Sequence, residues 1–362
     1  MSAVRKSCVL LLFCGLLAGV GIHSARAFEF AVGADLSFLK QAEDRGRVFK
    51  DGTNALPGLQ IFKNHGYNWI RLRVFVEPVS NNLPNSLAYT LATAKDAKKL
   101  GYKFLLDLHY ANSWADPGKQ PTPGDWIALS HGDRVKKVFE YSRDTLAAFC
   151  DAGVRPDMVQ VGNEITHGML WPDGRLPEHW DNFADYVCAG VKGVKAGCGT
   201  NPPPKIMIHI DQGGNIDKTK YFYDHFTRYD IPFDVMGFSY YPWWHGSLMD
   251  LRENLAFASR TYHKDVIVVE TAYNWRPARE SADRVGPFPE TPEGQREFLD
   301  EATRVVLGVP ENRGVGIFWW EPAVAGRGGI NSRSFFEENG NSLPVLGVFD
   351  KYTRPAQRMA NQ

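Results

Sequence analysis

Short runs of apolar, β-branched and aromatic residues alternate along this chain with longer amphipathic stretches. Eight of the short runs have the length and composition of strands. The predicted strands are Phe30–Asp35, Asn68–Val76, Lys103–Tyr110, Met158–Glu164, Lys205–Asp211, Val235–Tyr241, Val266–Thr271 and Val315–Glu321.

The longer stretches between these strands predict helices. They cover Leu56–His65, Ser86–Leu100, Asp133–Ala152, Asn182–Ala196, Lys218–Arg228, Leu248–His263 and Thr291–Leu307. Several are expected to end at a glycine after the last turn, namely Gly66, Gly101, Gly153 and Gly197. Strands that alternate with helices favour an α/β fold whose parallel sheet is closed as a (β/α)8 TIM barrel. A doubly wound open sheet is the alternative.

Polar residues gather at the C-terminal ends of the predicted strands. They include Asp35, Arg71, Arg73, Asp107, His109, Asn163, Glu164, His209, Asp211, Tyr240, Tyr241, Glu270 and Glu321. Active sites of (β/α)8 barrels lie at this end of the strands. The clustering therefore favours the closed barrel over the open sheet and indicates where its site lies.

The first 27 residues predict a secretory signal peptide. Arg5 and Lys6 form a basic start, Cys8 to Ile22 is apolar, and Ala25-Arg26-Ala27 matches a small-residue cleavage site. The apolar run is shorter than the ~20 residues that a transmembrane helix needs. We therefore expect a signal peptide over 1–27 and one catalytic barrel with extended βα loops over 28–362, secreted or periplasmic.

Charge and composition narrow the possible partners. The 362 residues contain 41 Lys+Arg and 41 Asp+Glu, which argues against nucleic-acid binding. Removing the predicted signal peptide removes three basic residues (Arg5, Lys6, Arg26) and leaves the chain slightly acidic. No second long apolar segment follows, so no membrane partner is expected. An aromatic content of 13% suits a cleft for flat, amphipathic ligands as well as a core.

Three cysteines remain after residue 27, namely Cys150, Cys188 and Cys198. They lack the CxxC spacing of zinc or redox sites. An exported chain permits one disulfide and one thiol among them. The sequence leaves the pairing open.

Glu164 and Glu270 each end an otherwise apolar strand. Burying a lone carboxylate there is costly unless it is hydrogen-bonded or used. A salt bridge to Arg71 or Arg73 is one explanation. Two glutamates that converge at a barrel mouth are instead typical of glycoside hydrolysis, where their separation of ~5–5.5 Å or ~6.5–9.5 Å distinguishes retention from inversion.

Sequence motifs along nearly the whole chain carry a family resemblance. They are Gly33-Ala34-Asp35-Leu36-Ser37, Arg71-Leu72-Arg73-Val74, Asp107-Leu108-His109-Tyr110, Trp114-Ala115-Asp116-Pro117-Gly118, Gly162-Asn163-Glu164-Ile165, Ser239-Tyr240-Tyr241-Pro242, Val269-Glu270-Thr271-Ala272-Tyr273 and Phe318-Trp319-Trp320-Glu321-Pro322. The chain resembles glycoside hydrolase family 53 of clan A, the arabinogalactan endo-β-1,4-galactanases. Asn-Glu alone marks only the wider clan, whereas the His-Tyr to Trp-Ala-Asp-Pro segment and Glu-Thr-Ala-Tyr are more specific.

The resemblance implies a secreted endo-β-1,4-galactanase that cleaves the galactan side chains of pectin with retention. Glu164 matches the general acid/base, whose pKa should be raised, and Glu270 matches the nucleophile, which must be ionised. Tyr241 matches a hydroxyl donor to Glu270. Asn163 matches the residue that grips the sugar 2-hydroxyl.

Further residues are expected to bind the polysaccharide. By resemblance, Asp35 and His109 bind hydroxyls at the innermost sugar site. Arg73 shares strand parity with Arg71 and lies nearer the mouth. The remaining expected contacts are stacking by Trp114 and Trp320, with Trp243 and Trp244 as further flat faces, and hydrogen bonding by Asp116. His109 could instead be a core histidine bonded to Asp107 or Asp35, and any single tryptophan could be core.

No metal or cofactor is expected. No second histidine stands at ligand spacing from His109. The bacterial branch of the family resembles calcium binders in its seventh βα loop, but here that loop carries Arg276 and Arg279 where oxygen ligands are wanted. The eighth loop carries Arg327 and Arg333, which a neutral galactan does not require.

Two other functions remain open. The chain could be another retaining β-glycanase of the clan, such as a mannanase or xylanase, or a glycan-binding barrel without activity. The presence of both Glu164 and Glu270 argues against a glycan-binding barrel without activity. In each case the expected partner is a polysaccharide, here β-1,4-galactan, with no nucleic acid and no membrane, and the chain is expected to act as a monomer.

Overall fold

The computed structural model describes residues 29–80, 82–278, 284, 286–324 and 329–352. Its main sheet is a closed barrel of eight parallel strands, which are neighbours in sequence order. The strands are β1 (Ala31–Asp35), β4 (Trp69–Val74), β5 (Lys103–Leu108), β6 (Met158–Val161), β9 (Lys205–Ile210), β10 (Val235–Tyr240), β11 (Asp265–Thr271) and β12 (Gly314–Trp320). The (β/α)8 prediction is confirmed, and the open sheet is excluded because β1 pairs with both β4 and β12.

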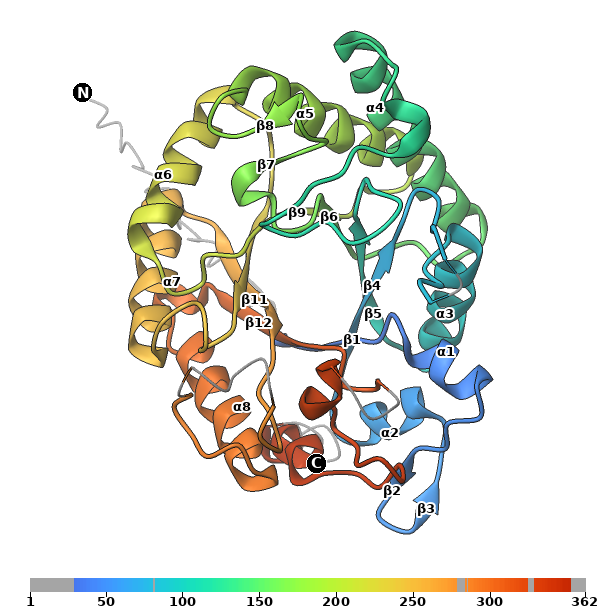
Figure 1. Cartoon of the computed structure of the whole chain (residues 1–362), viewed down its shortest axis with the longest axis vertical. Helices are drawn as coiled ribbons and strands as arrows, with labels where there is room; N and C mark the ends of the chain where they lie inside the picture. Colours follow the sequence, from blue (N-terminus) through green and yellow to red (C-terminus); the bar gives the residue numbers. More distant parts are fainter. Residues whose placement is uncertain (1–28, 81, 279–283, 285, 325–328, 353–362) are drawn as a thin grey trace, which may run out of the picture.

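Helices surround this barrel, as Figure 1 shows. They are α1 (Leu39–Asp44), α2 (Gly58–Asn64), α3 (Leu87–Lys99), α4 (His131–Asp151), α5 (Trp180–Gly197), α6 (Ile216–Phe226), α7 (Leu248–Tyr262) and α8 (Pro292–Leu307). The sequence did not predict α1 or the two hairpins formed by β2 (Lys50–Asp51) with β3 (Asn54–Ala55) and β7 (Gly168–Met169) with β8 (Gly174–Arg175). These additions lie in βα loops, which accounts for part of the extra length.

Several strands end earlier than the hydrophobic pattern predicts. Tyr110, Glu164 and Glu321 have positive φ values of 50°, 46° and 53°. Residues other than glycine rarely adopt this left-handed backbone conformation. It turns the chain out of the strand at the C-terminal end of the barrel, so these residues lie just beyond the sheet, where Glu164 enters the site and Tyr110 packs against α4.

Three of the four predicted glycine stops behave as expected. Gly66, Gly101 and Gly153 follow α2, α3 and α4 with positive φ. The prediction for Gly197 is wrong, because Gly197 is the last residue of α5 and not a residue beyond it. A Cβ there would lie 2.4 Å from the backbone oxygen of Arg143 in α4. Gly197 therefore serves close packing of α5 on α4.

The barrel interior is apolar at its lower end and polar above. An inner cluster consists of Ala31, Trp69, Leu105, Met158, Met207, Val235, Ile267, Val269 and Phe318. Strand parity then directs the residues two positions later toward the same interior, among them Arg71, Asp107, Gln160 and His209. The apolar layer thus forms a floor for the polar layer above it.

Candidate active site

Glu164 lies just beyond β6, at the start of a short 3₁₀ turn. Its side chain is 8% exposed, and its Oε1 accepts a 2.6 Å hydrogen bond from the Ser239 hydroxyl of β10. Burial and the nearby negative charges of Glu270 and Asp211 raise the pKa of Glu164 well above its usual value. A carboxyl group in these surroundings is suited to hold a proton at neutral pH.

Glu270 reaches the same mouth because β11 contains an irregularity. The register with β10 shifts between Phe238 and Ser239, so that Ser239 pairs with Glu270 and Val269 is passed over. A β-bulge of this kind re-aims a side chain. It allows Glu270 to face the site although Val269, its direct neighbour, belongs to the inner cluster.

The contacts of Glu270 differ from those of Glu164. Arg71 Nη1 lies 2.7 Å from Glu270 Oε1, and the Tyr241 hydroxyl donates to Oε2 at 3.0 Å. Burial raises the pKa of Glu270, whereas Arg71 acts in the opposite direction. The cation and the hydroxyl donor are the surroundings that an ionised nucleophile needs, and the Tyr241 contact is the one predicted from the sequence.

Arg71 is the centre of a buried network. Besides Glu270 it binds Asp35 at 2.8 Å, Asp107 at 2.9 Å and the amide oxygen of Asn163 at 2.8 Å. The amide nitrogen of Asn163 donates to the backbone oxygen of Ala115 at 2.8 Å. This pairing fixes the amide orientation of Asn163.

Arg73 and Asp35, both expected to bind the polysaccharide, are buried in this structure. Neither has exposed surface, and Arg73 forms ion pairs with Asp35 and Glu321. Its guanidinium lies 5.0 Å from the ring centre of Phe38 and 4.6 Å from that of Trp114. Strand parity was right for both arginines, but Arg71 and not Arg73 contacts a glutamate of the pair. In this structure Arg73 and Asp35 are buried members of the network around Arg71.

Half-buried aromatic side chains form one wall of the mouth. The rings of Trp114 and Trp320 are 6.1 Å apart, and His109 lies 6.3 Å from Trp114. His109 Nδ1 is 3.0 Å from Asp107 Oδ2, one of the partners that the core-histidine alternative named. Asp116 stands apart, partly exposed and 3.5 Å from Lys119.

The model of glycosyl hydrolase family 53 matches residues 31–350. This chain belongs to that family. An arabinogalactan endo-β-1,4-galactanase of Thermothelomyces thermophilus is 34% identical over 88% of this chain and 98% of that protein. The family 53 catalytic domain of Ignisphaera aggregans superposes with a TM-score of 0.83 at 30% identity, covering 90% and 97% of the two chains. A fungal β-1,4-galactanase structure gives 0.81 at 32% identity, covering 89% and 99%.

Four residues of this family 53 site had no predicted catalytic or sugar-binding role, although Arg71 and His209 were among the polar residues expected at this end of the barrel. Arg71, Gln160, His209 and Ser239 have no exposed surface and connect the other site residues by hydrogen bonds. Inward strand parity was the available signal for Arg71, Gln160 and His209. Parity alone does not distinguish a residue that binds the carboxylates from one that fills the barrel.

Arg333 is a further addition to this mouth. Its guanidinium lies 5.5 to 5.9 Å from the ring centres of Tyr241, Trp243, Trp244 and Trp320. Trp244 is 45% exposed and Trp243 is buried. The Arg333 guanidinium thus lies among tryptophan side chains that were predicted to offer flat faces to sugar rings.

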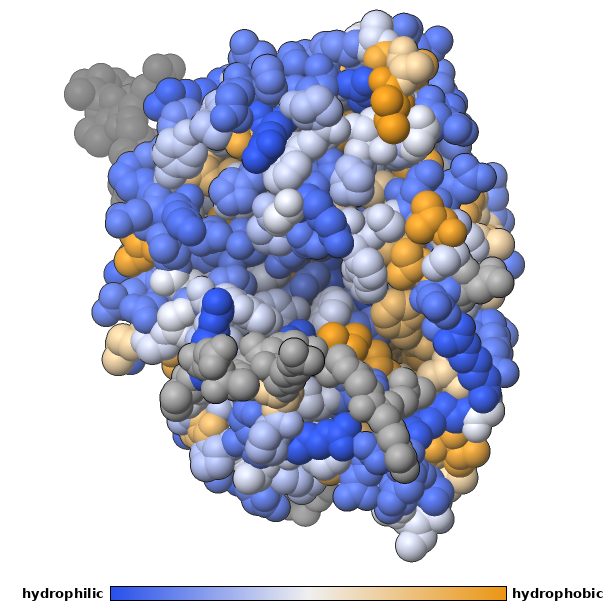
Figure 2. All heavy atoms as spheres, in the orientation of Figure 1, coloured by the Kyte–Doolittle hydropathy of each residue, from blue (hydrophilic) through white to orange (hydrophobic). Residues whose placement is uncertain are grey.

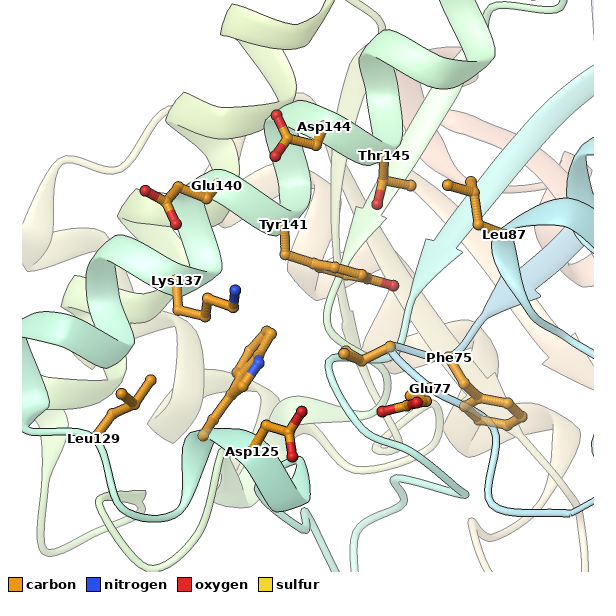
Figure 3. Close-up of a pocket in the computed structure, with 12 residues that line it drawn as sticks. Phe75, Glu77, Leu87, Asp125, Leu129, Lys137, Glu140, Tyr141, Asp144 and Thr145 are labelled. Carbon is orange, nitrogen blue, oxygen red and sulfur yellow. The ribbon is translucent and has the colours of Figure 1, made fainter.

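The face seen in Figure 1 is hollowed near its middle, where Figure 2 shows mostly hydrophilic residues around the depression. A separate groove of about 630 Å³ lies beside α4 and is lined by Phe75, Glu77, Asp125, Trp126, Lys137, Tyr141 and their neighbours. Figure 3 shows these side chains. Neither Glu164 nor Glu270 lines that groove, so it is distinct from the site of the paired carboxylates.

Metal-binding clusters and membrane-spanning helices can be assessed only for the described residues. In the ranges that the structure describes, no group of three or more His, Cys, Asp or Glu residues could hold a metal ion. Residues 279–283 and 285 of the seventh βα loop, with Arg279, and Arg327 of the eighth lie outside the described residues. No described helix is both long enough and apolar enough to cross a bilayer. The predicted signal peptide, residues 1–27, also lies outside the described part.

Proposed function

We propose that this family 53 glycoside hydrolase is an endo-β-1,4-galactanase that cleaves the β-1,4-galactan side chains of pectic arabinogalactan. The observation that carries this proposal is the placement of Glu164 and Glu270 at one barrel mouth in unlike surroundings. Glu164 is buried near two acids, whereas Glu270 contacts Arg71 and Tyr241. Two carboxyl groups in such unlike surroundings are suited to the separate roles of acid and nucleophile.

In the first step Glu270 attacks the anomeric carbon and Glu164 donates its proton to the leaving oxygen. The attack forms a galactosyl ester on Glu270 and breaks the glycosidic bond. Formation of the ester removes the negative charge of Glu270, which faces Arg71. Arg71 keeps Asp35 and Asp107 as charged partners. Glu164 becomes a carboxylate.

In the second step Glu164 takes a proton from a water molecule, and the resulting nucleophile attacks the same anomeric carbon. Glu270 leaves as a carboxylate, and Arg71 and Tyr241 again neutralise it. Two inversions give net retention. Both residues return to their starting protonation states, so no cofactor is needed.

The aromatic wall supports sugar binding. Trp114 and Trp320 present faces on which a pyranose ring packs, and Asn163, His109 and Asp116 are the proposed hydrogen-bonding groups. Asp35 and Arg73 act by holding Arg71 and Trp114 in place. We also propose that residues 1–27 direct export and are then removed, and that the mature chain acts as a monomer and binds neither nucleic acid nor membrane.

Digestion of unbranched β-1,4-galactan, followed by chromatography and proton NMR, tests this function. Oligosaccharides should appear early, and the first reducing ends should be β-anomers that then mutarotate. Parallel digests of mannan, xylan and cellulose should yield no product. First products with the α configuration would contradict retention. Cleavage of mannan or xylan but not of galactan would show that the proposed substrate is wrong.

A further inference from the structure

A ring of hydrogen bonds begins and ends at Glu164. The backbone N–H of Glu164 points at His209 Nδ1 at 3.4 Å, and His209 Nε2 lies 2.9 Å from Ser239 Oγ. The Ser239 hydroxyl completes the ring at Glu164 Oε1, 2.6 Å away. The ring joins the ends of three strands, β6, β9 and β10.

Donor and acceptor accounting sets the direction of this ring. Nδ1 of His209 also lies 3.2 Å from the amide oxygen of Asn163, so two arrangements are conceivable. That oxygen already accepts from Arg71 at 2.8 Å and from Gln160 at 3.0 Å, which uses both lone pairs. The backbone N–H of Glu164 is buried and needs an acceptor. Nδ1 therefore accepts, and the proton of the neutral imidazole is on Nε2.

The remaining bonds follow from this tautomer. Nε2–H of His209 donates to Ser239 Oγ, so the Ser239 hydroxyl has its own hydrogen available for Glu164 Oε1. An oxygen that accepts this bond is a poor place for the carboxyl proton. The acidic proton of Glu164 is left to Oε2, the oxygen outside the ring.

We propose that His209 and Ser239 are positioning residues that direct the catalytic proton of Glu164 to Oε2 and hold Oε1 as an acceptor through both steps. This inference rests on the proposed role of Glu164 as general acid/base. Neither residue has exposed surface, so both act through Glu164 and not by touching sugar. The ring also ties the carboxyl group to the left-handed backbone of the same residue.

The charges around the ring are consistent with a histidine that stays neutral. Burial and the positive charge of Arg71 on β4, with His109 and His245, hold the pKa of His209 well below its usual value. A protonated ring would place an N–H against the Glu164 N–H. Facing Glu164 itself are Glu270 from β11, Asp211 beyond β9, Tyr241 beyond β10 and Arg71.

Ser239→Ala removes the hydroxyl that stabilises the Glu164 carboxylate. The alkaline limb of kcat/KM, which follows loss of the Glu164 proton, should move to higher pH. On galactan kcat should fall by about 10- to 100-fold, the size expected for a hydrogen bond to a charged group, with little change in KM. An aryl β-1,4-galactobioside with a good leaving group needs less acid assistance and should lose much less.

Ser142→Ala is the matched control. Ser142 is also fully buried and makes two hydrogen bonds, to Tyr110 and the Val138 backbone, but lies on α4. Its loss should lower stability without moving the alkaline limb. Ser239→Thr retains a hydroxyl and should restore the wild-type limb.

His209→Leu should move the alkaline limb in the same direction by a smaller amount. Because His209 reaches the carboxyl group through Ser239, the double variant should match Ser239→Ala and not the sum of the two shifts. In the wild type, nitrogen-15 NMR should show an Nε2–H tautomer across the active pH range. The inference is overturned by an Nδ1–H tautomer, by a protonated ring, or by an unmoved limb in Ser239→Ala. Failure of the wild type on galactan would instead overturn the proposed function.

Discussion

Arg71 Nη1 lies 2.7 Å from Glu270 Oε1 and links that carboxylate to the buried acids Asp35 and Asp107. One cation thus faces three carboxylates in a fully buried position. Desolvation of Arg71 is opposed by the fields of Asp107, Glu270 and Asp35, which together raise its pKa. A buried arrangement of this kind depends on every partner remaining present.

Arg71→Met should therefore impair both catalysis and folding. Glu270 acts in its ionised form, and Arg71 lowers its pKa. Loss of the cation should raise that pKa and move the acidic limb of kcat/KM to higher pH. Unpaired buried carboxylates should lower the free energy of unfolding by about 3–5 kcal/mol. Activity profiles and denaturant titrations measure the two effects.

Two further variants serve as comparisons for Arg71→Met. Arg71→Lys keeps the charge but not the fork of donors, so it should move the acidic limb less than Arg71→Met does. Arg143→Met removes an exposed arginine of α4 and should change neither quantity. An unmoved acidic limb in Arg71→Met would contradict the assigned role.

Small-anion rescue should distinguish Glu270 from Glu164. Glu270→Ala should lower turnover by about 10⁴-fold or more while ligand binding persists, because no covalent intermediate can form. Azide should then attack an activated aryl galactobioside directly and release an α-galactobiosyl azide. In Glu164→Ala the intermediate still forms, so azide should give the β product.

The exposed glutamate of α7 provides the control for these variants. Glu253→Ala should behave as the wild type and yield no azide adduct. If Glu270→Ala gave the β product and Glu164→Ala the α product, the roles of nucleophile and general acid/base would be reversed. Full activity of Glu270→Ala on galactan would contradict the double-displacement mechanism.

Trp320 should contribute to binding more than to the chemical step. It lies half-buried at the mouth, 6.1 Å from Trp114 and 5.9 Å from Arg333. Trp320→Ala should raise KM about tenfold, since an aromatic contact is worth about 0.5–1.5 kcal/mol beyond its area, and should change kcat less. The KM of Trp320→Phe should lie between those of the wild type and Trp320→Ala. Trp180→Phe, on α5 outside the barrel, should leave KM unchanged. Unaltered KM in Trp320→Ala would place this ring outside the sugar path.

The strands could be predicted because a buried parallel strand has a simple composition. Boundaries such as that after Val161 could not, because local backbone conformation ends the strand. Glu164 has a positive φ that the glutamate side chain does not favour and that only the assembled site requires.

The same limit applies to the site. Family motifs identified Glu164, Glu270 and Tyr241, whose contacts agree with their expected surroundings. Strand parity did not predict that Arg71, and not Arg73, contacts Glu270, because this depends on how neighbouring strands are staggered around the barrel. His209 and Ser239 lie far apart in sequence, and only barrel closure brings them to Glu164.

The sulfur atoms of Cys150 and Cys198 lie 3.8 Å apart, at the C-terminal ends of α4 and α5. Both are free thiols in this structure, as is Cys188. Their proximity selects one of the three pairings that the sequence left open. Small residues on α5, including Gly197, permit the close helix packing that brings the two sulfurs together.

Incubation with a small-molecule disulfide should therefore join Cys150 to Cys198 and leave Cys188 reactive. The chain loses the mass of two hydrogen atoms, and the oxidant accepts the two electrons. Burial and the neighbouring Cys150 raise the pKa of Cys198 to about 11, so the reaction should be slow at neutral pH. The crosslink should stabilise the fold by about 2–4 kcal/mol. Peptide mapping of the wild type and of Cys188→Ser should find the same crosslink, whereas a bridge that includes Cys188, or three thiols after prolonged oxidation, would refute this pairing.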